Sequence, residues 1–159
     1  MNVKKVYHLE LEEDFEKDYI IALHTPLEAY QLAFYLNRTI NSNFKRSRKD
    51  LRNKASKGDF IHFEWEDKTH DFQCSLFSNK CQVEIQQIKS VSNTLFDLSL
   101  RNELSLLPEL KQVDFFIKSS DHETIETVLS HLKKWSKISL LYIVDTEVIK
   151  KKINVIFHK

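Results

Sequence analysis

The first half of the chain shows two patterns typical of strands. Residues 7–11 alternate apolar and polar positions, as a half-buried strand does. Residues 19–23 instead form an unbroken apolar run, which is typical of a central strand covered on both faces. Alternation over residues 59–66 and again over 72–76, on either side of a turn at 66–69, predicts an antiparallel hairpin. Its first arm has one face with Ile61, Phe63 and Trp65 and another with His62, Glu64 and Glu66.

A first helix is predicted over residues 26–41. Thr25 is placed to be the N-cap, Pro26 suits the first helical position, and Glu28 completes a capping box with Thr25. The segment is nearly all apolar up to Asn37, so we expect it to be heavily buried on the sheet.

The C-terminal third predicts a β-α-β unit. A strand over residues 113–118 leads to a capping box at 120–123, an amphipathic helix ending near Trp135, and a strand over 138–144 parallel to the first. One helical turn at 145–147 and a last strand over 153–157 follow. Between the halves, Val83, Ile85 and Ile88 indicate a strand and residues 94–100 a short second one.

These elements predict an α+β fold class. We expect one domain over residues 1–159, with a mainly antiparallel sheet, two principal helices packed on one face, and the β-α-β unit at the C-terminus.

Composition removes several classes of site. With one glycine and two prolines, the chain has no glycine-rich phosphate loop, and left-handed turns must use Asn or Asp. Cys74 and Cys81 lack metal-ligand spacing and are interpreted as free thiols, with a disulfide as the alternative and zinc as a third option. No cofactor or metal is expected. The absence of a signal peptide or membrane span predicts a cytoplasmic protein with no membrane partner.

Positive charge is concentrated in residues 45–57, where seven basic residues face one acid in a chain of net charge +1. Three interpretations stay open: a solvated loop or edge strand whose charges discourage aggregation, a surface for an acidic protein partner, and an RNA-binding surface on which Phe44 could stack against a base. The candidate binding residues are Lys45, Arg46, Arg48, Lys49 and Arg52.

Catalytic groups are hard to find. Glu109 and Asp114 could form an acid–base pair, but we favour structural roles, in which Glu109 accepts backbone N–H groups and Asp114 caps a neighbouring turn. Contact with a partner or ligand is the alternative. The seven histidines are interpreted as surface groups or as satisfied core groups, and His24 is the one most expected to be structural. Asn37 is expected to bond a carbonyl rather than a ligand.

The segment Leu107-Pro108-Glu109, three residues, then Val113-Asp114-Phe115 resembles the motif of the bacterial IPExxxVDY family. Leu107 replaces Ile, and Phe115 replaces Tyr and lacks its hydroxyl. The resemblance implies an α+β cytoplasmic protein from a family without an assigned function. Its gene neighbourhood, near fatty-acid synthesis and a double-strand-specific ribonuclease, makes an acyl carrier protein or RNA the first partners to test.

These observations predict a non-enzymatic adaptor or binding module that contacts an acidic protein partner through the basic segment. An RNA-binding accessory protein using the same segment is the alternative. The sequence leaves the partner and the oligomeric state open.

Overall fold

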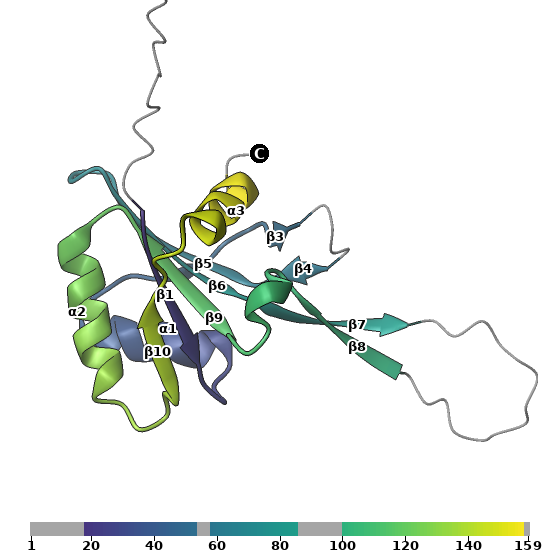
Figure 1. Cartoon of the computed structure of the whole chain (residues 1–159). Helices are drawn as coiled ribbons and strands as arrows, with labels where there is room; N and C mark the ends of the chain where they lie inside the picture. The colour runs from purple at the N-terminus through teal and green to yellow at the C-terminus, as the bar shows by residue number, and fades with distance from the viewer. Residues whose placement is uncertain (1–17, 54–57, 86–99, 158–159) are drawn as a thin grey trace, which may run out of the picture.

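The computed structural model describes residues 18–53, 58–85 and 100–157, and its centre is a six-stranded sheet. The strands follow the order β10-β1-β9-β6-β5-β2, with every neighbouring pair antiparallel (Figure 1). This confirms the predicted α+β class and mainly antiparallel sheet. The strand bounds are β1 Tyr19–His24, β2 Lys45–Arg46, β5 His62–Asp67, β6 Phe72–Ser78, β9 Phe115–Ser119 and β10 Leu140–Ile143.

β1 is a central strand, as its apolar run predicts. It pairs with β10 on one side and β9 on the other, and both neighbours run antiparallel to it. β9 and β10 are therefore parallel to each other, as expected for the β-α-β unit, but β1 lies between them. Successive β1 side chains enter different clusters, since Ile21 packs on one face of the sheet and Ile20 on the other.

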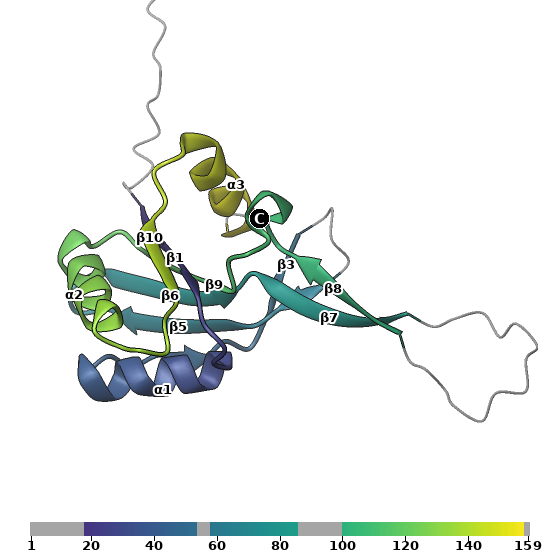
Figure 2. The ribbon, with the colours of Figure 1, turned by 60° about the horizontal axis from the view of Figure 1, so that its bottom comes forward.

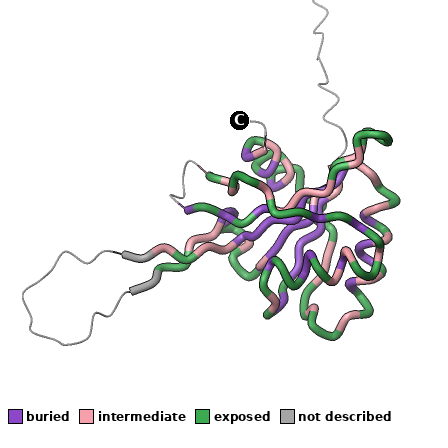
Figure 3. The backbone as a smooth tube through the Cα atoms, turned by 180° about the vertical axis from the view of Figure 1, so that it is seen from behind, coloured by how far each residue is buried: buried purple, intermediate pink, exposed green. Residues whose placement is uncertain are grey.

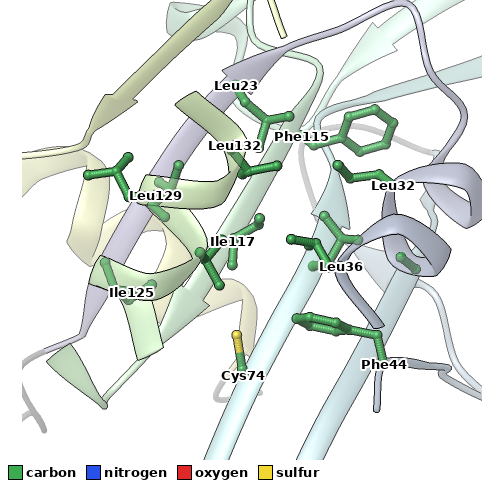
Figure 4. Close-up of a cluster of buried hydrophobic side chains, with 14 of the residues drawn as sticks. Leu23, Leu32, Leu36, Phe44, Cys74, Phe115, Ile117, Ile125, Leu129 and Leu132 are labelled. Atoms are coloured by element: carbon green, nitrogen blue, oxygen red, sulfur yellow. The ribbon is translucent and has the colours of Figure 1, made fainter. Parts of the chain in front are cut away.

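Two helices, α1 (Ala29–Thr39) and α2 (His122–Lys133), cover one face of this sheet. Leu32 and Leu36 of α1 pack beside Leu132 of α2, over Ile117 of β9 and Leu23 of β1 (Figure 4). All five side chains are fully buried, so this face is a continuous hydrophobic core.

The opposite face carries a third helix, α3 (Glu147–Phe157). The helical turn predicted at residues 145–147 continues as this helix, and the last strand predicted over 153–157 is wrong. Ile149, Ile153 and Ile156 recur at helical spacing and bury on Phe116 and Ile20. The second face of the sheet is also apolar, and a helix lets all three isoleucines bury against it. Figure 2 shows α3 and α1 on opposite sides of the sheet.

Both predicted capping boxes are also wrong. The N-cap of α1 is Glu28, three residues later than predicted, and its backbone N–H donates to Oε1 of Gln31 at 2.9 Å. The Thr25 hydroxyl accepts from the N–H of Leu27, which precedes the helix, at 3.3 Å and donates to the carbonyl of Lys137 at 2.8 Å. α2 begins after Asp121, whose carboxylate accepts from the Thr124 N–H at 2.9 Å.

The predicted hairpin is present as β5 and β6, but its turn lies at residues 68–71 rather than 66–69, and its first arm is interrupted at Ile61. β4 (Asp59–Phe60) ends and β5 begins on either side of Ile61, so Phe60 and His62 are both buried while Ile61 is 38% exposed. The turn closes at Asp71 with φ 50°, and Asn41 after α1 has φ 55°. Asn and Asp thus supply the left-handed residues, as the shortage of glycine predicts.

Two small ribbons extend from the main sheet. β3 (Leu51–Arg52) pairs with β4, and β7 (Lys80–Ile85) pairs with β8 (Leu100–Ser105) in an arm that projects from the body (Figures 1 and 3). The indicated strand around Val83 is therefore present in β7. Residues 7–11, Ile88 and residues 94–99 lie outside the described ranges.

The one glycine of the chain lies where these two ribbons meet. A Cβ added to Gly58 would lie 2.5 Å from Sγ of Cys81 and 3.3 Å from Cδ1 of Leu104. Glycine is needed there because neighbouring side chains approach its Cα closely. Its backbone conformation does not require glycine, since its φ is not positive.

Candidate functional site

Asp114, the second carboxylate of the motif segment (residues 107–115), is held by three groups directly before β9. Its Oδ2 accepts a hydrogen bond from the Thr25 N–H at 2.9 Å and pairs with Nδ1 of His24. Its Oδ1 lies 2.7 Å from Nζ of Lys80, and the side chain is only 14% exposed. Asp114 therefore caps the turn after β1, as predicted, and holds His24 and β7 to that turn.

Glu109 has a different role from the one predicted. It lies in a short 3₁₀ helix, η1 (Pro108–Leu110), which is largely exposed, and its carboxylate pairs with Lys152 of α3. Both side chains are nearly half exposed, at 44% and 47%. Glu109 thus holds α3 rather than buried backbone N–H groups. Because Glu109 and Asp114 contact different elements, the structure does not bring them together as an acid–base pair.

Pro108 and Phe115, the remaining motif candidates, occupy opposite environments. Pro108 is exposed at the first position of η1, where its missing N–H costs no hydrogen bond. Phe115 is 6% exposed and packs in the core beneath α1, where an apolar ring needs no hydroxyl (Figure 4).

A residue that the sequence did not single out, Asn79, holds the motif segment in place. It is fully buried between β6 and β7. Its Oδ1 accepts from the Leu107 N–H at 2.8 Å, and its Nδ2 donates to the carbonyls of Leu110 and Val113 at 2.9 Å each. Its backbone N–H also donates to the carbonyl of Asp114 at 2.8 Å. One amide thus fixes both ends of the segment.

Asn37 makes a similar clamp at the other end of the molecule. Its Nδ2 donates to the carbonyl of Phe44 at 3.0 Å, and its Oδ1 accepts from the N–H of Phe44 at 2.8 Å and from the hydroxyl of Ser42 at 2.7 Å. The expected carbonyl bond is therefore present, and the side chain is used to hold the loop that leads into β2.

The basic segment forms one wall of an open hollow of about 800 Å³. Four exposed cations line this wall, and we call them the basic rim: Lys45, Arg46, Arg48 and Lys49. The hollow lies on the same face as α3, over the part of the sheet that this helix leaves uncovered, and Phe157 at the end of α3 lines it. The structure thus gathers these four candidate binding residues around one hollow.

The cations of the segment differ in how far they are engaged. Arg46 pairs with Asp50, donates to the carbonyls of Ser47 and His62 at 3.2 Å each, and lies 6.0 Å from the centre of the Phe63 ring. Arg52 pairs with Asp59 across the β3–β4 ribbon and does not line the hollow. Within the described part of the chain, Lys45, Arg48 and Lys49 form no ion pair.

The floor of the hollow carries charges of both signs. The register aligns Lys45 with Glu64, Glu64 with Ser75, and Ser75 with Lys118, so these side chains share one face. Lys118 is 13% exposed, lies 3.3 Å from Oδ2 of Asp18, and sits 4.7 Å from the centre of the Phe157 ring. Glu66 and Asp50 also line the hollow.

His62 lies on the face of Glu64 and Glu66, as the pattern predicts, but it is buried there at the edge of the floor. It is 4% exposed, and its ring meets the Phe157 ring edge-on at 5.4 Å. Burial, with the nearby Arg46 guanidinium as a smaller cause, lowers the pKa of His62 to about 4. His62 is therefore neutral at pH 7, and its Nε2 has no hydrogen-bond partner among the described residues.

The structure decides the expectations for Phe44 and for the two cysteines. Phe44 is 4% exposed and packs edge-on against Trp65, so the predicted stacking of Phe44 on a base is wrong. Cys74 and Cys81 are free thiols, as favoured. Cys74 is fully buried, and burial raises the pKa of its thiol, so it remains protonated.

The described residues contain no group of three or more His, Cys, Asp or Glu side chains placed to hold a metal ion. None of the helices in the described ranges is long and apolar enough to span a membrane.

Comparison with known proteins gives no relative from which to carry over a role. No family model matches the chain, and no curated protein and no solved structure matches it significantly. The resemblance to the IPExxxVDY family therefore stays a prediction. The hollow has to be interpreted from its own chemistry.

Proposed function

We propose that the chain is a cytoplasmic, non-enzymatic binding module that captures an acidic protein partner at the basic rim of the hollow. The observation that carries the proposal is the position of Lys45, Arg48 and Lys49. All three are exposed on one wall of a cavity of about 800 Å³ and form no ion pair within the described residues. Clustered cations of this kind steer an oppositely charged partner and fix its orientation.

The mixed charge of the hollow favours a protein over RNA. Glu64, Glu66 and Asp50 line it together with the cations, and a continuous phosphate backbone would be repelled by these carboxylates. A protein surface can instead place acidic side chains at the rim and a basic or neutral group over the floor. The burial of Phe44 also removes the aromatic platform on which the RNA interpretation depended.

The non-enzymatic part of the proposal is supported by the way the candidate carboxylates are used. Asp114 is occupied by Thr25, His24 and Lys80, and Glu109 by Lys152. Neither lines the hollow. The resemblance stated above would make an acyl carrier protein one acidic partner of the right kind.

The test is affinity capture with the full chain and two matched variants. The rim variant replaces Lys45, Arg46, Arg48 and Lys49 by Ser. The control variant removes the same number of positive charges by replacing four exposed lysines away from the hollow by Ser: Lys111, Lys133, Lys134 and Lys151.

We expect the wild-type chain and the control variant to retain the same acidic protein from a lysate of the native cells. The rim variant should lose it, and nuclease treatment should leave capture unchanged. Binding of the purified partner should weaken as salt rises. An identical set of captured proteins for the wild-type chain and the rim variant, or release of the captured material by nuclease, would refute the proposal.

A further inference from the structure

The two edge strands of the main sheet differ in how well they are protected against pairing with a further strand. At the β2 edge, the exposed Lys45 and Arg46 form the strand itself, and Asn37 occupies the N–H and carbonyl of Phe44 directly before it. Charged edge residues and occupied backbone groups are the usual protection against pairing with another strand. β10, at the other edge, has the sequence Leu140-Leu141-Tyr142-Ile143 and contains neither a charge nor a proline.

The hydrogen-bond pattern identifies which β10 backbone groups point away from the molecule. The N–H of Val144 donates to the carbonyl of Ile20 at 2.8 Å, so Val144 and Ile20 form a hydrogen-bonded pair. Such pairs alternate along an antiparallel ladder. Since the register matches Leu141 with Leu23 and Ile143 with Ile21, these two pairs are not hydrogen-bonded. The Leu23 carbonyl agrees with this, because it accepts from Asp114 on the opposite side of β1.

Leu141 and Ile143 therefore each present an N–H and a carbonyl, placed symmetrically about Tyr142, at an edge that no other strand of the described residues covers. This arrangement complements itself. When a second β10 approaches antiparallel with Tyr142 opposite Tyr142, Leu141 of each copy faces Ile143 of the other, and both pairs can exchange two hydrogen bonds. The side chains suit the same register, because Leu140 and Ile143 are 38% and 41% exposed and would meet apolar neighbours.

The charges that flank β10 favour the antiparallel arrangement over a parallel one. Lys137 precedes the strand, Asp145 follows it, and both are exposed. Antiparallel pairing brings the Lys137 end of one copy beside the Asp145 end of the other, whereas parallel pairing would bring like charges together.

We propose that two copies of this chain associate by antiparallel pairing of β10, which continues the sheet across a two-fold axis at Tyr142. The occupant of the open edge is thus the same strand of a second copy. The inference depends on the edge alone and does not depend on the proposed function of the hollow.

The test measures the mass of the full chain by sedimentation over a range of concentrations. We expect twice the 18.9 kDa chain mass at high concentration, falling toward 18.9 kDa on dilution. Ile143→Lys places a charge in the paired edge and should give 18.9 kDa throughout. Leu141→Pro should do the same, because it removes an N–H that the β1 ladder does not use. Val155→Lys is the matched control: this side chain is 63% exposed on α3, outside β10, and the variant should keep the doubled mass.

Amide hydrogen exchange keeps the proposal testable if a variant does not fold. In the wild-type chain, the amides of Leu141 and Ile143 should exchange more slowly as concentration rises, while the amide of Arg46 at the other edge should not change. Three results would overturn the proposal: a mass of 18.9 kDa at every concentration, a doubled mass that survives Ile143→Lys in a folded protein, or protection of Leu141 that is independent of concentration. The last would mean that the chain covers its own edge.

Discussion

Replacing Asn79 by Ala should be among the most damaging single substitutions away from the hydrophobic clusters. The change removes the acceptor of the Leu107 N–H and the amide group that donates to the carbonyls of Leu110 and Val113. Leu107 and Val113 are 2% and 0% exposed, so water cannot replace the lost bonds without an opening of the structure.

The magnitude follows from the number of groups left without a partner. The Leu110 carbonyl keeps a second donor, the N–H of Val113 at 2.9 Å. The Leu107 N–H and the Val113 carbonyl are then the two buried groups that lose a hydrogen-bond partner. A buried polar group without a partner costs about 1–3 kcal/mol. Two such groups give a loss of about 2–6 kcal/mol, which is a large share of the roughly 5–15 kcal/mol that stabilises a typical domain.

Urea unfolding followed by circular dichroism measures this loss. With a urea dependence of about 2 kcal/mol per molar, the midpoint should fall by about 1–3 M. Asn102→Ala is the matched control, since Asn102 is exposed on β8, and its midpoint should stay within about 0.25 M of the wild type. If Asn79→Ala unfolds at the same midpoint as Asn102→Ala, the amide is not the clamp of the motif segment.

Three further substitutions test other parts of the argument. Glu109→Ala should cost less than about 1 kcal/mol in urea unfolding, because its pair with Lys152 is nearly half exposed; a loss above 2 kcal/mol would mean that Glu109 has a buried role. Gly58→Ala should cost about 1–3 kcal/mol through the 2.5 Å approach to Cys81 Sγ, and adding Cys81→Ala should recover most of it; no recovery would place the strain elsewhere. His62 has a pKa of about 4 when folded against 6.5 when unfolded, so the unfolded chain takes up the proton first and stability should fall as the pH is lowered from 6.5 to 4. His62→Gln should flatten that part of the urea-midpoint profile, and an unchanged slope would show that other groups cause it.

Local patterns were sufficient for most of the sheet and for α2. β1, the β5–β6 hairpin and β9 each have a hydrophobic period that depends only on near neighbours in sequence, and tertiary packing did not alter it. α3 was misassigned because residues 153–157 are rich in branched apolar side chains, which suit a strand locally. Only the buried stripe of Ile149, Ile153 and Ile156 on the second face of the sheet identifies a helix.

The parts of the site that the sequence missed depend on distant partners. Asn79 bonds residues 28 to 34 positions away, and Thr25 bonds a carbonyl 112 positions away, so neither role leaves a local signal. His62 shares a face with Glu64 and Glu66, as the alternation predicts, but its burial depends on Phe157, 95 positions away, and leaves no local signal. The basic rim was recognisable because charge clustering is a property of sequence alone.

The amide of Asn37 has a consequence for how far the protein can polymerise. It fills the backbone positions of Phe44 that an added strand would need at the β2 end of the sheet. Any growth at that end would first have to displace two hydrogen bonds and pack against Lys45 and Arg46. In the pairing proposed through β10, a main sheet blocked in this way at one end has a single site for extension, so the joined sheet stops at two copies and does not continue into fibrils.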